Sequence, residues 1–201
     1  MPKVVDHDVR RAELAEATRR VVLRDGIERA TVRSVAAEAG WSPGSLRYYF
    51  PDQRELLAFA MEQVAHRVGE RIAALEAGGD PRATVERLLE QVLPLDAERR
   101  MEMEVWLAFW ARAQADAGLR AQREETQRAL RLFVRGCLVV LAEAGLMGPE
   151  LSLEVETSRL HALLDGLALH GVTSPQTTTP RRMRAALRAH LDALAVNDGT
   201  R

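Results

Sequence analysis

Hydrophobic residues recur at intervals of three and four along most of the chain, and this spacing predicts a series of α-helices. Gly, Pro and short polar residues separate the periodic stretches and mark where each helix begins and ends. Because β-branched and aromatic residues are sparse outside short runs, we expect an all-α fold. The expected helices span approximately residues 9–24, 32–39, 43–50, 52–78, 81–94, 97–117, 119–144, 152–171 and 180–196.

Residues 31–50, TVRSVAAEAGWSPGSLRYYF, have the spacing of two short helices joined by a tight turn. Gly40 can adopt the positive φ that lets the chain turn. The second helix has a start signal in Ser42, an N-cap residue, followed by Pro43. A side chain larger than methyl at Ala36 would push the two helices apart. The residues expected to make the apolar contacts between the helices are Val35, Ala39, Trp41, Leu46 and Tyr49. This pattern predicts a helix-turn-helix unit that binds duplex DNA.

The polar face of the second helix carries hydroxyl groups, a guanidinium and a phenol, and no acidic residue. Such a face suits a major groove flanked by phosphates. A solvated helix in a helical bundle is the alternative interpretation. We also expect Arg10 and Arg11 near a flanking phosphate or the minor groove. The residues expected on the DNA side are Thr31, Arg33, Ser42, Pro43, Gly44, Ser45, Arg47, Tyr48, Tyr49 and Arg54.

Residues 40–44, GWSPG, also match the G-x-S-x-G nucleophile elbow of serine hydrolases. That motif needs a strand before the serine and the backbone N–H after it as part of the oxyanion hole. The residues before Gly40 are expected to be helical, and Pro43 has no N–H. A hydrolase that uses Ser42 is therefore the weaker hypothesis.

Residues 9–60 resemble the TetR family of one-component bacterial regulators in the order of their helices and in the run Tyr48-Tyr49-Phe50-Pro51-Asp52. The segments VWLAFWA at 105–111 and LLDGLALHG at 163–171 are similar to the BetI-like choline sensors of that family. The resemblance implies a three-helix DNA-binding domain over residues 1–51. It also implies a helical effector-binding and dimerisation domain over residues 52–201.

The function that this resemblance implies is transcriptional repression by a homodimer that binds a palindromic operator and is released by a small-molecule effector. A transcriptional activator of the same fold is the alternative, and a helical interaction module without a DNA role is a rival from another class. Two positions depart from the family pattern, since Gln53 stands where a phosphate-binding Lys is usual and Arg47 where many relatives carry Tyr. Arg54 is expected to take over the phosphate contact.

The segment MEMEVWLAFWARA, residues 101–113, predicts an aromatic helix whose apolar side chains crowd more than one face. A helix that is apolar all round is central to its domain, and aromatic side chains line most small-molecule pockets. For a cationic effector, Trp106 and Trp110 supply ring faces and Asp165 the counter-charge; an apolar effector is the other option. The expected effector residues are Met103, Trp106, Phe109, Trp110, Phe133, His161 and Asp165. Core packing of the aromatic residues, and an ion pair of His161 with Asp165 at a dimer seam, are the alternatives.

The last two predicted helices carry wide apolar stripes, and little of the chain remains to cover the final one. Self-association would bury these stripes. The family resemblance implies a four-helix bundle about a two-fold axis. The residues expected at this interface are Leu160, Leu164, Leu167, Leu187, Leu191 and Leu194.

Composition limits the remaining possibilities. The chain has 201 residues, 47% of them hydrophobic, which is enough for a substantial core. The net charge is −1, and residues 1–60 hold ten Lys and Arg against nine Asp and Glu, so any basic surface is expected to be local. Cys137 is expected to be a small buried hydrophobe, with a redox-sensing thiol as the alternative. We find no metal-spaced cluster, no apolar run of about 18 residues and no signal peptide, so we expect no cofactor, no membrane association and a cytoplasmic protein.

Overall fold

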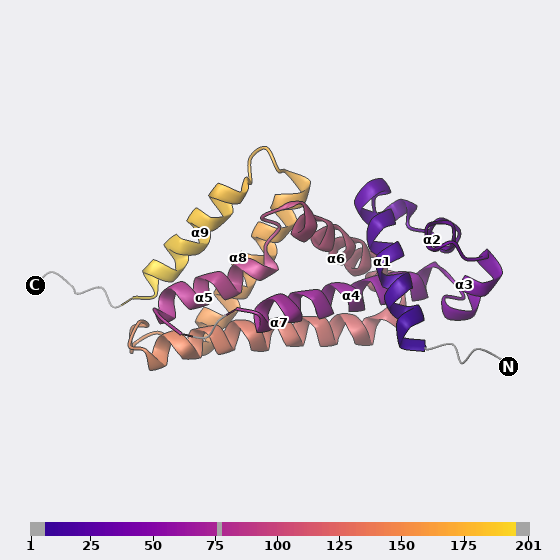
Figure 1. Cartoon of the computed structure of the whole chain (residues 1–201). Helices are drawn as coiled ribbons and strands as arrows, with labels where there is room; N and C mark the ends of the chain where they lie inside the picture. The colour runs from indigo at the N-terminus through magenta and orange to yellow at the C-terminus, as the bar shows by residue number, and fades with distance from the viewer. Residues whose placement is uncertain (1–6, 76–77, 196–201) are drawn as a thin grey trace, which may run out of the picture. The chain divides into compact units, whose positions relative to one another are not determined.

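The computed structural model describes residues 7–75 and 78–195, and every regular element within these ranges is helical. This confirms the all-α prediction. Figure 1 shows the helices along the chain. They are α1 (His7–Asp25), η1 (Ile27–Arg29), α2 (Val32–Ala39), α3 (Pro43–Tyr49), α4 (Gln53–Ala73), α5 (Pro81–Leu89), η2 (Glu90–Val92), α6 (Ala97–Ala115), α7 (Ala117–Glu143), α8 (Leu153–Thr173) and α9 (Pro180–Ala193).

Local capping determines where several of these helices begin. Three of them start with Pro at the first helical position, directly after a residue whose side chain accepts a hydrogen bond from the first turn: Ser42 before Pro43, Asp80 before Pro81, and Thr179 before Pro180. Such caps supply acceptors for N–H groups that have no partner within the helix. The start signals in the sequence are therefore confirmed.

Helix ends were predicted less accurately. The connecting helix α4 ends at Ala73, several residues before the Gly78-Gly79 pair. Its last turn tightens, with the N–H of Leu75 donating to the carbonyl of Ile72 at 3.2 Å. The final helix α9 ends at Ala193, and the predicted end near Val196 lies outside the described residues.

The chain forms two compact units. Unit 1 combines residues 1–67, as far as they are described, with residues 104–122, and unit 2 combines residues 68–103 with residues 123–201, again as far as described. Helices α4, α6 and α7 each contribute to both units. The domain boundary between residues 51 and 52 remains a prediction, and it lies inside unit 1.

The core of unit 1 holds the helix-turn-helix together. Helix α1 packs against α2, and α2 packs against α3 (Figure 1). The side chains at the centre of this core are completely or almost completely buried: Leu14, Val21, Val35, Ala36, Leu46 and Leu56. The predicted inward direction of Leu46 is therefore confirmed, and Ala36 is completely buried.

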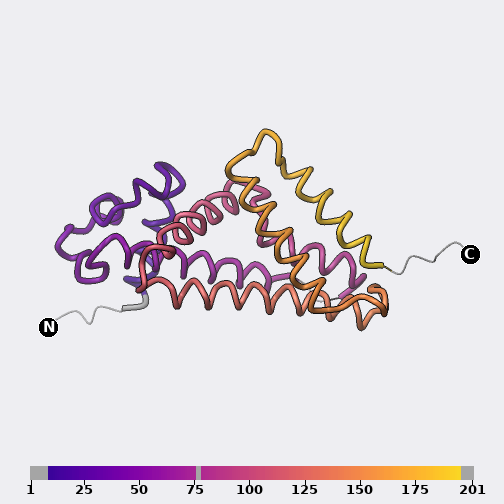
Figure 2. Tube along the Cα trace, turned by 180° about the vertical axis from the view of Figure 1, so that it is seen from behind, coloured from indigo at the N-terminus to yellow at the C-terminus, as the bar shows by residue number. Residues whose placement is uncertain are grey.

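The core of unit 2 is formed by α5, α7, α8 and α9. Helices α8 and α9 make a hairpin joined by the loop 174–179 (Figure 2). Its central side chains are Val85, Leu89, Val134, Leu138, Leu141, Leu160, Leu164, Met183, Leu187 and Leu191. Cys137 belongs to this cluster, and burial raises the pKa of its thiol to about 12, which supports the buried-hydrophobe interpretation. None of the described helices has an apolar stretch that would cross a membrane.

Candidate DNA-binding and effector sites

The predicted reading helix α3 presents one polar face and buries the other. Leu46 is completely buried, whereas Tyr48 is 80% exposed and Arg47 is also exposed. The Ser42 hydroxyl accepts the N–H of Ser45 at 3.0 Å, and the two hydroxyl oxygens lie 2.8 Å apart. The exposed face therefore offers two hydroxyl groups, a guanidinium and a phenol.

The turn before α3 has the geometry that the sequence predicted. Gly40 adopts φ 70°, in the left-handed region, and ends α2. The N–H of Trp41 donates to the carbonyl of Ala36 at 2.8 Å. At the other end of α2, Thr31 and Ser34 form a reciprocal capping box. The residues before Gly40 are helical, so the strand that a nucleophile elbow requires is not present at this position.

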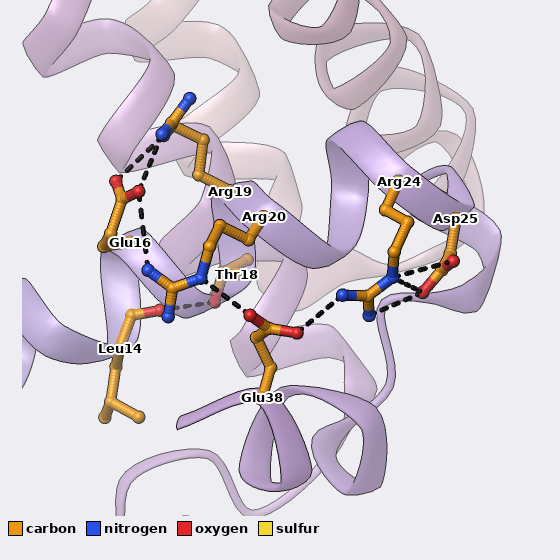
Figure 3. Close-up of polar contacts among 8 residues, drawn as sticks. All are labelled: Leu14, Glu16, Thr18, Arg19, Arg20, Arg24, Asp25 and Glu38. Carbon is orange, nitrogen blue, oxygen red and sulfur yellow. Dashed lines mark hydrogen bonds and ion pairs between the residues drawn. The ribbon is translucent and has the colours of Figure 1, made fainter. Parts of the chain in front are cut away.

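An ion-pair network joins α1 to α2, and it was not predicted from the sequence (Figure 3). Arg20 and Arg24 of α1 both donate to Glu38 of α2, each at 2.7 Å. The hydrogen bond from Arg24, followed by that from Arg20, lowers the pKa of Glu38. Arg24 also pairs with Asp25 at 3.0 Å. The network ties the first helix of the helix-turn-helix unit to its supporting helix.

Gln53 and Arg54, at the start of α4, both bind other groups of unit 1. The Gln53 side-chain amide donates to the carbonyl of Ala30 at 2.6 Å, which ties α4 to the residue just before the α2 cap. The Arg54 guanidinium lies 3.2 Å from Glu55 and 3.6 Å from Asp52. Two carboxylates thus already surround the group that was expected to take the phosphate, and that role of Arg54 remains a prediction.

Arg10 and Arg11 of α1 both contact other parts of unit 1. Arg10 pairs with Glu13 at 3.1 Å and lies over the ring of Trp41, 4.8 Å from its centroid. Arg11 pairs with Glu62 at 2.9 Å. Both side chains are therefore paired within unit 1, and their expected contact with a flanking phosphate or the minor groove remains a prediction.

The aromatic helix α6 has one fully buried ring and two half-buried ones. Phe109 is 1% exposed, while Trp106 and Trp110 are half-buried and stacked, with ring centroids 5.3 Å apart and an interplanar angle of 21°. Arg112 on the same helix is exposed. The prediction that α6 is apolar on every side was therefore wrong. Phe109 is a core residue, and the tryptophan pair presents the partly accessible aromatic surface.

The predicted polar anchors lie on α8 in unit 2. Nε2 of His161 and Oδ2 of Asp165 are 3.6 Å apart, and the side chains are 15% and 35% exposed. Burial raises the pKa of Asp165, and the charge of His161 opposes this rise. Phe133 also belongs to unit 2 and packs half-buried against its core. Trp106, Phe109 and Trp110 belong to unit 1, and Met103 is the last residue before them in unit 2.

The predicted dimer stripe is largely the core of unit 2. Leu160, Leu164, Leu187, Leu191 and Leu194 are each at most 2% exposed within the single chain, and Leu167 packs half-buried beside them. Val85 and Leu89 of α5, together with α7, cover this stripe. The argument that the chain has nothing left to cover α9 was therefore wrong. The exposed apolar residues of α8 lie instead at Val155, Ala162 and Leu169.

A buried ion pair within unit 2 was also missed. Arg71, in the last turn of α4, donates two hydrogen bonds to the Glu102 carboxylate of α6, at 2.7 and 2.6 Å. The Glu102 side chain is 5% exposed and that of Arg71 is 27% exposed. Bonding to this carboxylate raises the pKa of Arg71. No sequence signal identifies a pair of residues 31 positions apart.

Sequence comparisons match two family models. The model for bacterial regulatory proteins of the tetR family matches residues 14–60, and the model for the C-terminal region of BetI-type transcriptional repressors matches residues 81–196. The HTH-type transcriptional regulator PksA of Bacillus subtilis is 37% identical over 98% of this chain and 96% of its own length. The HTH-type transcriptional regulator BetI of Stenotrophomonas maltophilia is 33% identical over 85% of both chains.

Solved structures give the same fold. A transcriptional regulator from Rhodococcus sp. Rha1 has a TM-score of 0.76 at 32% identity, over 92% of this chain and 95% of its own. A putative transcriptional regulator from Saccharomonospora viridis, solved in complex with choline, has a TM-score of 0.80 at 23% identity, over 92% of this chain and 96% of its own.

Proposed function

Because the chain belongs to the TetR family of bacterial regulatory proteins, we propose that it represses transcription as a homodimer on a palindromic operator and is released by a small-molecule effector. The observation that carries the DNA-binding role is the outer face of α3. It exposes Ser45, Arg47 and Tyr48 while Leu46 is buried, and the helix contains no acidic residue. These groups bind phosphates and base edges in the major groove.

A gel-shift experiment tests this role. DNA from upstream of the protein's own gene should bind the full-length chain at nanomolar concentration, and rising salt should weaken the complex because phosphate contacts displace counterions. A random duplex of equal length is the control. Equal affinity for both duplexes would contradict a sequence-specific repressor, and no binding to either duplex would favour a helical interaction module.

The dimer surface we propose is the exposed face of the α8–α9 hairpin. On α8, Val155, Ala162 and Leu169 are spaced by seven residues, so they lie along one side of the helix, and all three are exposed. On α9, the small exposed residues Ala185 and Ala189 let a second helix approach closely. A two-fold dimer that binds a palindromic operator needs its two reading helices about 34 Å apart, in successive major grooves.

The dimer prediction concerns Ala162→Glu. A carboxylate at the centre of the exposed α8 face should convert the dimer into a monomer at micromolar concentration, because burying an unpaired charge is strongly unfavourable. Sedimentation velocity measures the change. Ala65→Glu, at an exposed alanine of α4, is the matched control and should remain dimeric. A dimeric Ala162→Glu variant would place the interface elsewhere.

The effector in this proposal binds against the half-buried Trp106–Trp110 stack. Indole faces attract cations. The stack lies in unit 1 together with the reading helix. In the same unit, the side-chain amide of Gln122, at the start of α7, donates a hydrogen bond to the Ala58 carbonyl of α4 at 3.2 Å. A ligand that displaces α6 therefore acts within the same unit that contacts DNA, and it releases the operator by favouring a state that binds DNA less well.

Trp106→Ala is the variant that tests this effector site. It should bind the operator as tightly as the wild type but require about tenfold more choline, betaine aldehyde or polyamine for release, since one aromatic face is lost. The measurement is the effector concentration that dissociates half of the protein–DNA complex. Leu107→Ala, at a half-buried neighbour on α6, should leave the response unchanged. A Trp106→Ala protein that unfolds would identify the ring as core.

A further inference from the structure

A continuous stack of rings leads from the turn of the helix-turn-helix unit to its reading face. Trp41 and Tyr49 meet edge to face, with centroids 5.5 Å apart and an interplanar angle of 63°. Tyr49 meets Tyr48 in the same manner, with centroids 5.5 Å apart and an angle of 81°. The Arg10 guanidinium of α1 lies 4.8 Å from the centroid of the Trp41 ring and completes the stack at its other end. We call these four residues the Tyr48 stack.

The inner end of this stack is fixed to the backbone of the helix-turn-helix unit. Trp41 directly follows Gly40, whose left-handed conformation sets the turn, and the Trp41 N–H donates to the carbonyl of Ala36. Ala36 is completely buried. Arg10 adds an attraction to the outer face of the indole, because the ring quadrupole favours a cation there. The indole is therefore a fixed support within unit 1.

The outer end is Tyr48, the most exposed large apolar side chain on the described part of unit 1, at 80%. A tyrosine this exposed and without neighbours samples several rotamers, and binding DNA would then require it to be ordered. Edge-to-face contact with Tyr49 limits these rotamers before DNA arrives. Contact between the two rings uses no hydrogen-bonding group of Tyr48.

We infer that Arg10, Trp41 and Tyr49 are positioning residues that hold the Tyr48 phenol in the orientation it uses on the operator. This inference rests on the proposed function, in which Tyr48 contacts DNA. It assigns Arg10 a role different from a direct phosphate contact, since the guanidinium is paired with Glu13 and stacked on the indole. Trp41 contacts the reading helix from the turn. According to this inference, Trp41 affects operator affinity although it does not contact DNA itself.

A double-mutant cycle tests the inference, with the DNA duplex from upstream of the gene as the probe. Trp41→Leu should weaken binding about three- to tenfold in the wild-type background, because it removes an aromatic support. In the Tyr48→Ala background the same substitution should change affinity less than twofold, since a residue that acts only through Tyr48 has nothing left to position. Equal factors in both backgrounds would overturn the inference.

Arg10→Gln provides a second arm that does not depend on the stability of Trp41→Leu, because the Arg10 side chain is 39% exposed. It should weaken binding about threefold in the wild-type background and leave the Tyr48→Ala variant unchanged. An Arg10→Gln effect of equal size in the Tyr48→Ala background would assign Arg10 to phosphate binding and overturn its place in the stack. If Tyr48→Ala alone leaves affinity unchanged while the wild type binds its operator, the inference fails and the proposed repressor stands.

Discussion

The double substitution Arg47→Ala and Tyr48→Ala should weaken operator binding by about 4 kcal/mol, roughly a thousandfold, without unfolding the protein. Each residue is exposed on α3, and each lost contact to a base or phosphate costs about 1–3 kcal/mol. The neighbouring Leu46 holds the helix in the core of unit 1 and is unchanged. Gel shift or fluorescence anisotropy on the operator duplex measures the loss.

The matched control is Arg135→Ala, which removes an exposed arginine from α7 in unit 2. It changes the net charge by the same amount as Arg47→Ala and should leave operator affinity unchanged. Thermal unfolding of the double variant should match the wild type to within about 0.5 kcal/mol, because both substitutions are on the surface. Wild-type affinity in the double variant would mean that the DNA-reading surface lies elsewhere on the protein.

Arg71→Met should lower the free energy of unfolding by about 3 kcal/mol, because it leaves the buried Glu102 carboxylate without its cationic partner. The Glu102 side chain is only 5% exposed, and both of its oxygens accept hydrogen bonds from Arg71. Methionine fills much of the space of the arginine stem, so the loss comes mainly from the charge. Urea denaturation followed by circular dichroism measures the change.

Two controls separate this charge effect from a packing effect. Adding Glu102→Leu to Arg71→Met removes the remaining charge and should restore most of the lost stability, since a buried pair is readily replaced by apolar residues. Arg11→Met breaks an exposed ion pair with Glu62 and should cost less than about 1 kcal/mol. A double variant as unstable as Arg71→Met would show that the methionine does not fit its site.

The sequence alone contained the information for helix starts and for the outer face of the reading helix. The start of α3 depends on Ser42 and Pro43, and the turn before it depends on Gly40, all within a few residues of one another. Capping and left-handed turns are local interactions, so residue type and spacing predict them. The same spacing correctly placed Leu46 inside and Tyr48 outside. The family resemblance, carried by those same residues, is confirmed by the comparisons.

Tertiary structure alone decided what covers each apolar face and which distant groups meet. Periodicity correctly indicated that Leu187 and Leu191 are buried, but it does not say which helices pack against them. In the structure, α5 and α7 of the same chain do so. Likewise, Glu102 meets Arg71 from 31 residues away, and Arg10 meets Trp41 from the same distance along the chain. Helical periodicity describes the face of one helix, whereas these contacts depend on how separate helices pack, which is set by the sum of many weak side-chain interactions.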